Sequence, residues 1–185
     1  GEQQAAAPQA MPAPQVEVAE VISQRITEWD SFTGRLESPQ TVALRPRVSG
    51  YIDMVAFEEG SEVKQGDTLF LIDNRPYKEE VNRLEAQLTQ VSSQLALAKT
   101  DYQRVVELSK TRAVSQEEVD NRRSALQQAE ASVQATRASL ALAKLNRGYT
   151  RVEAPISGKV YRALIKAGNY VSAGDTVLTS IVSTN

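Results

Sequence analysis

The side chains that most often carry enzymatic chemistry are absent from this sequence. None of the 185 residues is histidine or cysteine, which removes the commonest general base, the commonest transition-metal ligand and every thiol reaction. Among the acidic residues, two pairs are candidate sites, Glu58-Glu59 and Glu117-Glu118. Neither pair has the convergent partners that metal binding or acid–base catalysis requires. We interpret both as solvated and expect no catalytic residue, no metal site and no enzymatic activity.

The overall charge and the hydropathy argue against nucleic-acid binding and against a membrane-spanning segment. The 21 basic residues nearly balance the 23 acidic residues, for a net charge of −2, so nucleic-acid binding is not expected. No run of eighteen apolar residues occurs, so no segment of this sequence is expected to span a membrane. The sequence begins at Gly1, which is compatible with removal of a signal peptide or anchor upstream.

A long helical stretch occupies the middle of the sequence. None of the nine glycines and seven prolines lies between Tyr77 and Arg147. Apolar residues recur there with a 3.5-residue period, which is typical of a left-handed coiled coil. We call the apolar positions of this pattern the seam, because they would meet where the two helices touch. If the chain folds back near Arg112, the numbers of facing seam residues sum to 224, as in Leu95 with Ala129. The pattern predicts an antiparallel helical hairpin over 75–148, with each helix roughly 50 Å long.

Local signals mark the ends of the two helices. Asp73 or Asn74 can cap the first helix, which carries a proline in its first turn. Ser115 begins a capping box that opens the second helix, and Gly148 ends it. Arg122 occupies a seam position facing Tyr102, and we expect its guanidinium to lie over that ring or in water.

An internal repeat encloses the predicted hairpin. Residues 48–74 and 156–182 align without a gap, with four turn residues of the first copy identical in the second: Gly50/Gly158, Gly60/Gly168, Gly66/Gly174 and Asp67/Asp175. Such a repeat predicts two copies of one β-unit. Neither copy can bury its apolar face alone, so we expect them to pack together. The predicted class is α+β, with a β-domain of residues 43–74 and 149–182 interrupted by the helices.

The remaining segments lie at the two ends of the sequence. Residues 1–15 are rich in alanine, proline and glutamine and are expected to form a disordered linker. Residues 16–42 contain alternating, strand-like segments separated by turn residues.

The repeated unit resembles the half-motif of lipoyl and biotinyl carrier domains. In those domains two halves pack as a flattened β-sandwich, and a modified lysine lies in the tight turn between them. In this sequence the helical stretch replaces that turn, and no lysine stands in a short turn between the halves. We therefore expect no prosthetic group and no other cofactor.

The nested order, half-motif, helical hairpin and second half-motif, resembles the periplasmic adaptor proteins. These are also called membrane fusion proteins and serve resistance–nodulation–division (RND) tripartite efflux pumps. The resemblance covers about residues 16–182. Arg104, Leu108 and Ser115 fit the family's tip pattern R-x3-L-x6-S, Arg151–Gly158 resembles its return segment and Phe32–Leu36 its first strand.

This resemblance implies a function and a set of partners. The protein would be a non-catalytic adaptor that links an inner-membrane RND drug/proton antiporter to a TolC-like outer-membrane channel. Its hairpin tip would dock on the channel through Arg104, Leu108 and Ser115, with Lys110, Arg112 and Val114 beside them. It would assemble in a ring, as a hexamer or trimer of dimers, in the periplasm at the inner membrane. Residues 16–42 and 183–185 would belong to an incomplete β-barrel domain.

Alternatives remain open at two levels. An adaptor of an ABC-type exporter would have a similar architecture, and a lipoyl or biotinyl carrier would share the β-domain. Among the residues, Ser115 is explained by capping alone, Arg104 by a solvated surface charge, and Leu108 by burial in the seam.

Overall fold

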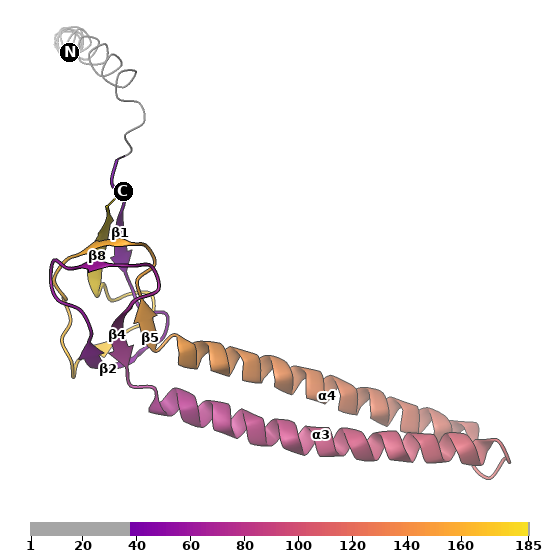
Figure 1. Cartoon of the computed structure of the whole chain (residues 1–185). Helices are drawn as coiled ribbons and strands as arrows, with labels where there is room; N and C mark the ends of the chain where they lie inside the picture. Colours follow the sequence, from indigo (N-terminus) through magenta and orange to yellow (C-terminus); the bar gives the residue numbers. More distant parts are fainter. Residues whose placement is uncertain (1–37, 185) are drawn as a thin grey trace, which may run out of the picture. The chain divides into compact units, whose positions relative to one another are not determined.

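The computed structural model describes residues 38–184 as two long helices and two curled β-sheets, an α+β fold (Figure 1). The predicted linker 1–15, most of the predicted strands 16–42 and Asn185 lie outside the described residues. The elements are β1 Thr41–Leu44, β2 Gly50–Val55, β3 Glu62–Val63, β4 Thr68–Ile72, α3 Arg75–Ser109, α4 Gln116–Gly148, β5 Arg151–Glu153, β6 Gly158–Val160, β7 Tyr170–Val171 and β8 Thr179–Ser183.

Each sheet combines strands from before and after the helices. One sheet has the order β1-β8-β6-β3 and the other the order β5-β4-β2-β7, and all neighbouring strands are antiparallel. Strand β1 begins at Thr41 and pairs Val42 with Ile181. Strand β8 includes Ser183, which pairs with Gly158. The sheets therefore extend slightly beyond both ends of the predicted β-domain.

The sequence repeat reappears as reciprocal backbone hydrogen bonds. The N–H of Gly60 donates to the carbonyl of Val160 at 2.8 Å, and the N–H of Gly168 donates to the carbonyl of Ile52 at 2.7 Å. Each bond joins one copy of the repeat to the other, at equivalent positions with the copies exchanged. Both glycines have positive φ, 82° and 92°, a conformation that is unfavourable for residues other than glycine. The two copies are thus related by approximate two-fold symmetry.

The core of the β-region draws on both copies. Its most completely buried apolar residues, each at most 1% exposed, are Ile52, Leu69, Phe70, Val160, Val171, Leu178 and Ile181. Close approach of the backbone accompanies this packing at Gly158, where a Cβ atom would overlap the carbonyl of Val182. Most strands alternate buried and exposed positions because successive side chains point to opposite faces of a sheet. In β4 the consecutive Leu69 and Phe70 are both buried where its pairing shifts register, and Leu178 joins the core from the residue before β8.

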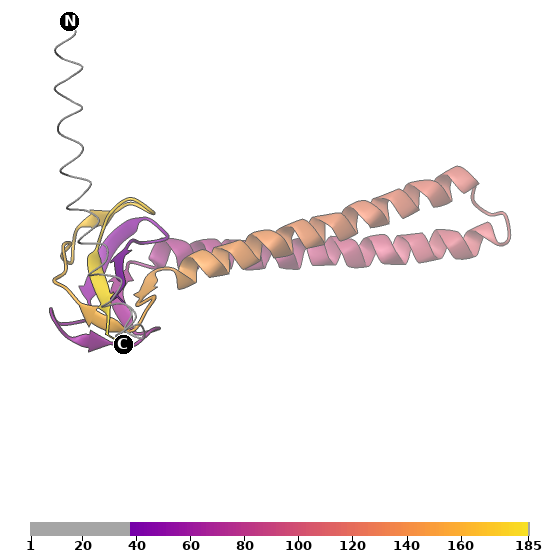
Figure 2. The same ribbon diagram turned by 90° about the horizontal axis from the view of Figure 1, so that it is seen from above.

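Helices α3 and α4 lie side by side and antiparallel (Figures 1 and 2). They contain 35 and 33 residues, about 50 Å each at 1.5 Å per residue. All their buried residues are predicted seam positions: Val81, Leu84 and Val105 in α3, and Val119, Val133, Thr136, Leu140 and Ala143 in α4. No helix in the described part of the chain is long and apolar enough to cross a membrane.

The helix ends at the sheets lie at the predicted residues, but their capping geometry differs from the expected one. Asn74 is the N-cap of α3, but its side chain makes no capping bond. Asp73 instead accepts a hydrogen bond from the N–H of Arg75 at 3.1 Å and pairs with its guanidinium at 2.7 Å. Gly148 is the last residue of α4, and Tyr149 follows with right-handed backbone angles. The helix therefore ends without a left-handed glycine.

Candidate partner-binding site

The turn that joins α3 to α4 lies at the end of the helical pair opposite the sheets (Figure 1). The structure brings all six predicted contact residues to this end: Arg104, Leu108, Lys110, Arg112, Val114 and Ser115. We call residues 104–115 the tip.

Ser115 caps helix α4 as predicted. Its side chain accepts a hydrogen bond from the backbone N–H of Glu118 at 3.1 Å, with extended backbone angles at Ser115 itself. The Glu118 carboxylate accepts a hydrogen bond from Arg122 at 2.9 Å. The structure gives no return bond from Glu118 to the N–H of Ser115, so only the serine half of the capping box is formed among the described residues. The cap holds the start of α4 in a fixed geometry.

Helix α3 ends in a Schellman-type turn that has arginine in place of glycine. The N–H of Ala113 donates to the carbonyl of Leu108 at 3.0 Å, and the N–H of Arg112 donates to the carbonyl of Ser109 at 3.1 Å. This pair of bonds is the Schellman pattern. Arg112 takes the left-handed position with φ of 58°, which costs a non-glycine residue roughly 1–2 kcal/mol. Sequence reasoning missed this turn because its usual marker, a glycine after the helix, is absent.

The charges of the tip are mostly neutralised within the chain. Arg104 pairs with Asp101 at 3.2 Å, and Lys110 pairs with Glu107 at 2.8 Å. Arg112 makes no ion pair with any residue that the structure describes. Leu108 is 40% exposed, so it is not a buried seam residue. The tip thus presents an exposed leucine and an unpaired guanidinium on a hydrogen-bonded turn.

Of the two positions expected for the Arg122 guanidinium, over the Tyr102 ring or in water, the structure shows a half-exposed guanidinium that does not lie over the ring. The guanidinium of Arg123 lies 5.7 Å from the Tyr102 ring centroid and donates to its hydroxyl at 3.2 Å. Arg122 instead pairs with Glu118 at 2.9 Å and with Asp101 of the other helix at 3.8 Å. Glu118 lies one turn before Arg122 on the same helical face, and helical side chains lean towards the preceding turn. The ion pair therefore competes successfully with the ring.

These contacts connect Arg104 to both helices. Asp101 bonds Arg104 on α3 and lies near Arg122 on α4. Arg104 is consequently part of an exposed ion-pair chain, in which each pair contributes little to stability. A substitution that neutralises Arg104 should disturb these ion pairs less than one that reverses its charge.

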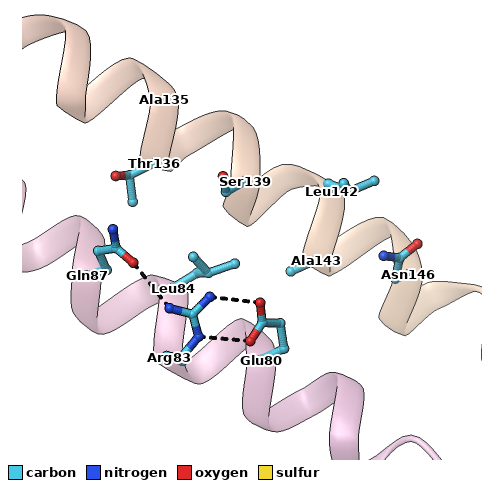
Figure 3. Close-up of a pocket in the computed structure, with 10 residues that line it drawn as sticks. All are labelled: Glu80, Arg83, Leu84, Gln87, Ala135, Thr136, Ser139, Leu142, Ala143 and Asn146. Carbon is cyan, nitrogen blue, oxygen red and sulfur yellow. Dashed lines mark hydrogen bonds and ion pairs between the residues drawn. The ribbon is translucent and has the colours of Figure 1, made fainter.

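A hollow is lined by residues of both helices, in the halves of α3 and α4 nearer the sheets. Figure 3 shows its lining residues. The hollow has a volume of about 450 Å³ and is lined by Glu80, Arg83, Leu84, Gln87, Ala135, Thr136, Ser139, Leu142, Ala143 and Asn146. Its carboxylate, Glu80, is bound by Arg83 at 2.9 Å, and that hydrogen bond lowers the pKa of Glu80. A carboxylate stabilised in this way is a poor proton acceptor near neutral pH. This hollow offers no acid–base chemistry.

Comparison with known proteins points to one family. The family described as RND MFP, barrel-sandwich hybrid domain, matches residues 40–183. The multidrug resistance protein MdtA of Photorhabdus laumondii is 36% identical over 165 residues, which are 89% of this chain and 41% of that protein. The MdtA protein of Erwinia amylovora is 38% identical over 172 residues, 93% of this chain and 42% of that protein. This chain spans about two fifths of the length of these curated relatives.

Solved structures show a similar fold. ZneB of Cupriavidus metallidurans matches with a TM-score of 0.57 and 23% identity, covering 77% of this chain and 60% of that one. The membrane fusion protein Spr0693 of Streptococcus pneumoniae matches with a TM-score of 0.55 and 15% identity, covering 79% and 66%. At these identities the likeness concerns the fold alone.

Proposed function

This chain belongs to the RND membrane fusion protein family, and from that membership we propose that it is part of a periplasmic adaptor of a tripartite multidrug efflux pump. The adaptor is non-catalytic and links an inner-membrane RND drug/proton antiporter to a TolC-like outer-membrane channel. It resides in the periplasm, associated with the inner membrane. The family profile, which covers residues 40–183, supports this function over an adaptor of an ABC-type exporter.

The architecture that we propose for the adaptor has four parts. Residues 43–74 and 149–182 form a lipoyl-like domain from two halves, which the reciprocal bonds between the two copies of the repeat support. Residues 75–148 form a coiled-coil hairpin, supported by the burial of seam residues from both helices. Thr41, Val42 and Ser183 pair within the β-sheets and extend the lipoyl-like domain at both ends. We assign the rest of the predicted segments 16–42 and 183–185 to a β-barrel domain, and residues 1–15 to a linker. The halves are connected through the helices rather than a short lysine-bearing turn, which argues against a lipoyl or biotinyl carrier.

We assign channel docking to the tip, and the place of the exposed Leu108 beside the free turn of the hairpin carries this assignment. A leucine that is 40% exposed beside a rigid, hydrogen-bonded turn is an apolar anchor of the kind that interface cores use. Arg112 adds an unpaired cation for carboxylates or free carbonyls at the ends of a partner's helices. Arg104, Lys110, Val114 and Ser115 complete the contact surface. Several adaptors in a ring, a hexamer or trimer of dimers, would add weak single contacts through multivalency.

The test uses two exposed leucines of the same helix. Leu108→Gln and Leu97→Gln each remove an apolar side chain, exposed by 40% and 62%, but only the first lies at the tip. In the full-length protein, we expect Leu108→Gln to abolish drug resistance in a strain that depends on this pump. Leu97→Gln should retain it, with equal protein levels for both. Full resistance with Leu108→Gln would remove the assignment of docking to the tip.

A further inference from the structure

A short segment between β1 and β2 contacts the bases of both helices. Tyr77, the third residue of α3, donates a hydrogen bond from its hydroxyl to the backbone carbonyl of Ser49. Tyr149, which follows α4, accepts a hydrogen bond from Nη1 of Arg47 at 3.2 Å. The Arg47 guanidinium also lies 5.0 Å from the Tyr149 ring centroid. Between the two contact residues, Val48 is buried in the β-core.

The internal repeat separates the contacts that build the sheets from these additional ones. In the second copy, Pro155–Ser157 takes the place of Arg47–Ser49. The serines play the same part in both copies, because Ser49 Oγ accepts from the N–H of Ala173 at 2.8 Å and Ser157 Oγ accepts from the N–H of Gln65 at 2.9 Å. Arg47 has no such counterpart, since proline replaces it. The second copy forms the equivalent serine bond without a cation at this position, so the repeated β-unit does not itself call for Arg47.

The tyrosine hydroxyls are also more than packing groups. Both rings are half-buried and pack against the β-core, a role that phenylalanine would fill equally well. Burial raises the pKa of Tyr77, so its hydroxyl is a neutral donor at physiological pH. The hydroxyl of Tyr77 and the guanidinium of Arg47 add direction to the packing, because hydrogen bonds and cation–π contacts weaken as the geometry departs from its optimum.

We propose that Arg47–Ser49 is a two-point latch that fixes the direction of the helical pair on the β-sheets, with Tyr77 and Arg47 as positioning residues. One contact holds the start of α3 and the other the end of α4, so rotation about either helix base is opposed by the other. A small rotation at the base displaces a tip roughly 50 Å away by a large distance. The consequence for docking rests on the proposed function, whereas the latch itself does not.

Spin-label distance measurements test the latch directly. The chain contains no cysteine, so Lys159→Cys on β6 with Gln103→Cys near the tip gives one distance from sheet to hairpin. Gln103→Cys with Asn121→Cys gives an internal hairpin distance. Tyr77→Phe and Arg47→Ala are made singly and together in each labelled chain. Tyr161→Phe with Arg137→Ala is the matched control, because these side chains make no hydrogen bond or ion pair with other described residues.

Each latch substitution should raise the ratio of displaced to seated hairpins by roughly five- to tenfold, the effect of losing one net hydrogen bond or cation–π contact. The sheet-to-hairpin distribution then broadens, the internal distribution stays unchanged, and the control matches the wild type. Arg47→Lys should recover only part of the effect, because an ammonium lacks the planar guanidinium face. If the double variant does not fold, Tyr77→Phe alone decides the question.

Unchanged sheet-to-hairpin distances in Tyr77→Phe and Arg47→Ala would overturn the latch, as would broadening of the internal distance by the same amount. This failure is distinguishable from failure of the docking assignment. A latch that fails here leaves the resistance defect of Leu108→Gln in place. Conversely, normal resistance with Leu108→Gln leaves the spin-label result unaffected.

Discussion

At the scale of single residues, two glycines of this chain face opposite environments. A Cβ atom on Gly158 would overlap the carbonyl of Val182, whereas one on Gly148, at the end of α4, would meet open space. We expect Gly158→Ala to lower the free energy of unfolding by about 1–3 kcal/mol, through overpacking against backbone that cannot move aside. Gly148→Ala should raise it by about 0.5–1 kcal/mol, since alanine is the better helix former. Chemical denaturation of both variants checks the pair, and equal effects would contradict the close approach at Gly158.

The left-handed backbone of Arg112 leads to a second prediction. Glycine adopts φ of 58° without the strain that arginine bears, so Arg112→Gly should stabilise the hairpin by about 0.5–1 kcal/mol net. Thermal unfolding followed by circular dichroism measures this gain. If the unpaired guanidinium contributes to docking, the stabilised variant should nevertheless have reduced efflux in the full-length protein. A destabilised variant would show that the turn depends on a contact of the arginine side chain.

Asp73 gives a prediction about acid stability. The hydrogen bond from Arg75 lowers the pKa of Asp73 from 3.8 to about 2. Because the folded-state pKa lies below the unfolded one, the contribution is fully present above pH 3.8 and is lost as the pH falls towards 2. The difference in melting temperature between the wild type and Asp73→Asn should therefore shrink over this window. A difference that stays constant from pH 5 to pH 2 would exclude the pairing.

Local chemistry decides which residue-level predictions hold. Ser115 could be predicted as a cap because the bond that it makes spans three residues of the same chain. The contact of Arg123 with Tyr102 could not be predicted. Two adjacent arginines can reach the ring, and Arg122 is held instead by its ion pair with Glu118. The Schellman turn at Arg112 could not be predicted either, because arginine occupies the left-handed position at which a glycine usually marks such a turn.

At the scale of elements, the heptad pattern predicts the register of the two helices. Glycine and proline spacing predicted the helices, and the gapless repeat predicted the turns, because both signals depend on backbone conformation. Strand ends were less predictable. Strand β8 begins three residues later than the repeat equivalent of β4, although its partners β1 and β6 correspond to the partners β5 and β2 of strand β4.

Cysteine pairs test this register. Leu95→Cys with Ala129→Cys places two thiols at facing seam positions, where the β-carbons lie within disulfide reach. Leu95→Cys with Val133→Cys displaces one thiol by a full helical turn. We expect the first pair to oxidise readily and the second poorly, as measured by thiol titration and non-reducing electrophoresis. Equal or reversed yields would show that the helices pair in another register.

At the scale of the whole molecule, the proposed lipoyl-like domain should be independent of the hairpin. Core residues from both copies pack together, and the reciprocal bonds join the copies without help from the helices. Replacing residues 75–147 with a short glycine-rich turn should therefore leave a folded β-domain with dispersed amide resonances in NMR spectra. Collapsed, narrow dispersion would show that the helices are needed to hold the halves together.

The central claim is that the tip meets an outer-membrane channel, and photocrosslinking in cells tests it most directly. A photoreactive amino acid replaces Leu108 in the full-length protein, and the same amino acid at Leu97 serves as the control. We predict a crosslink from position 108 to an outer-membrane channel, and none from position 97. A folded, expressed adaptor that crosslinks from neither position, or from both alike, would contradict the account.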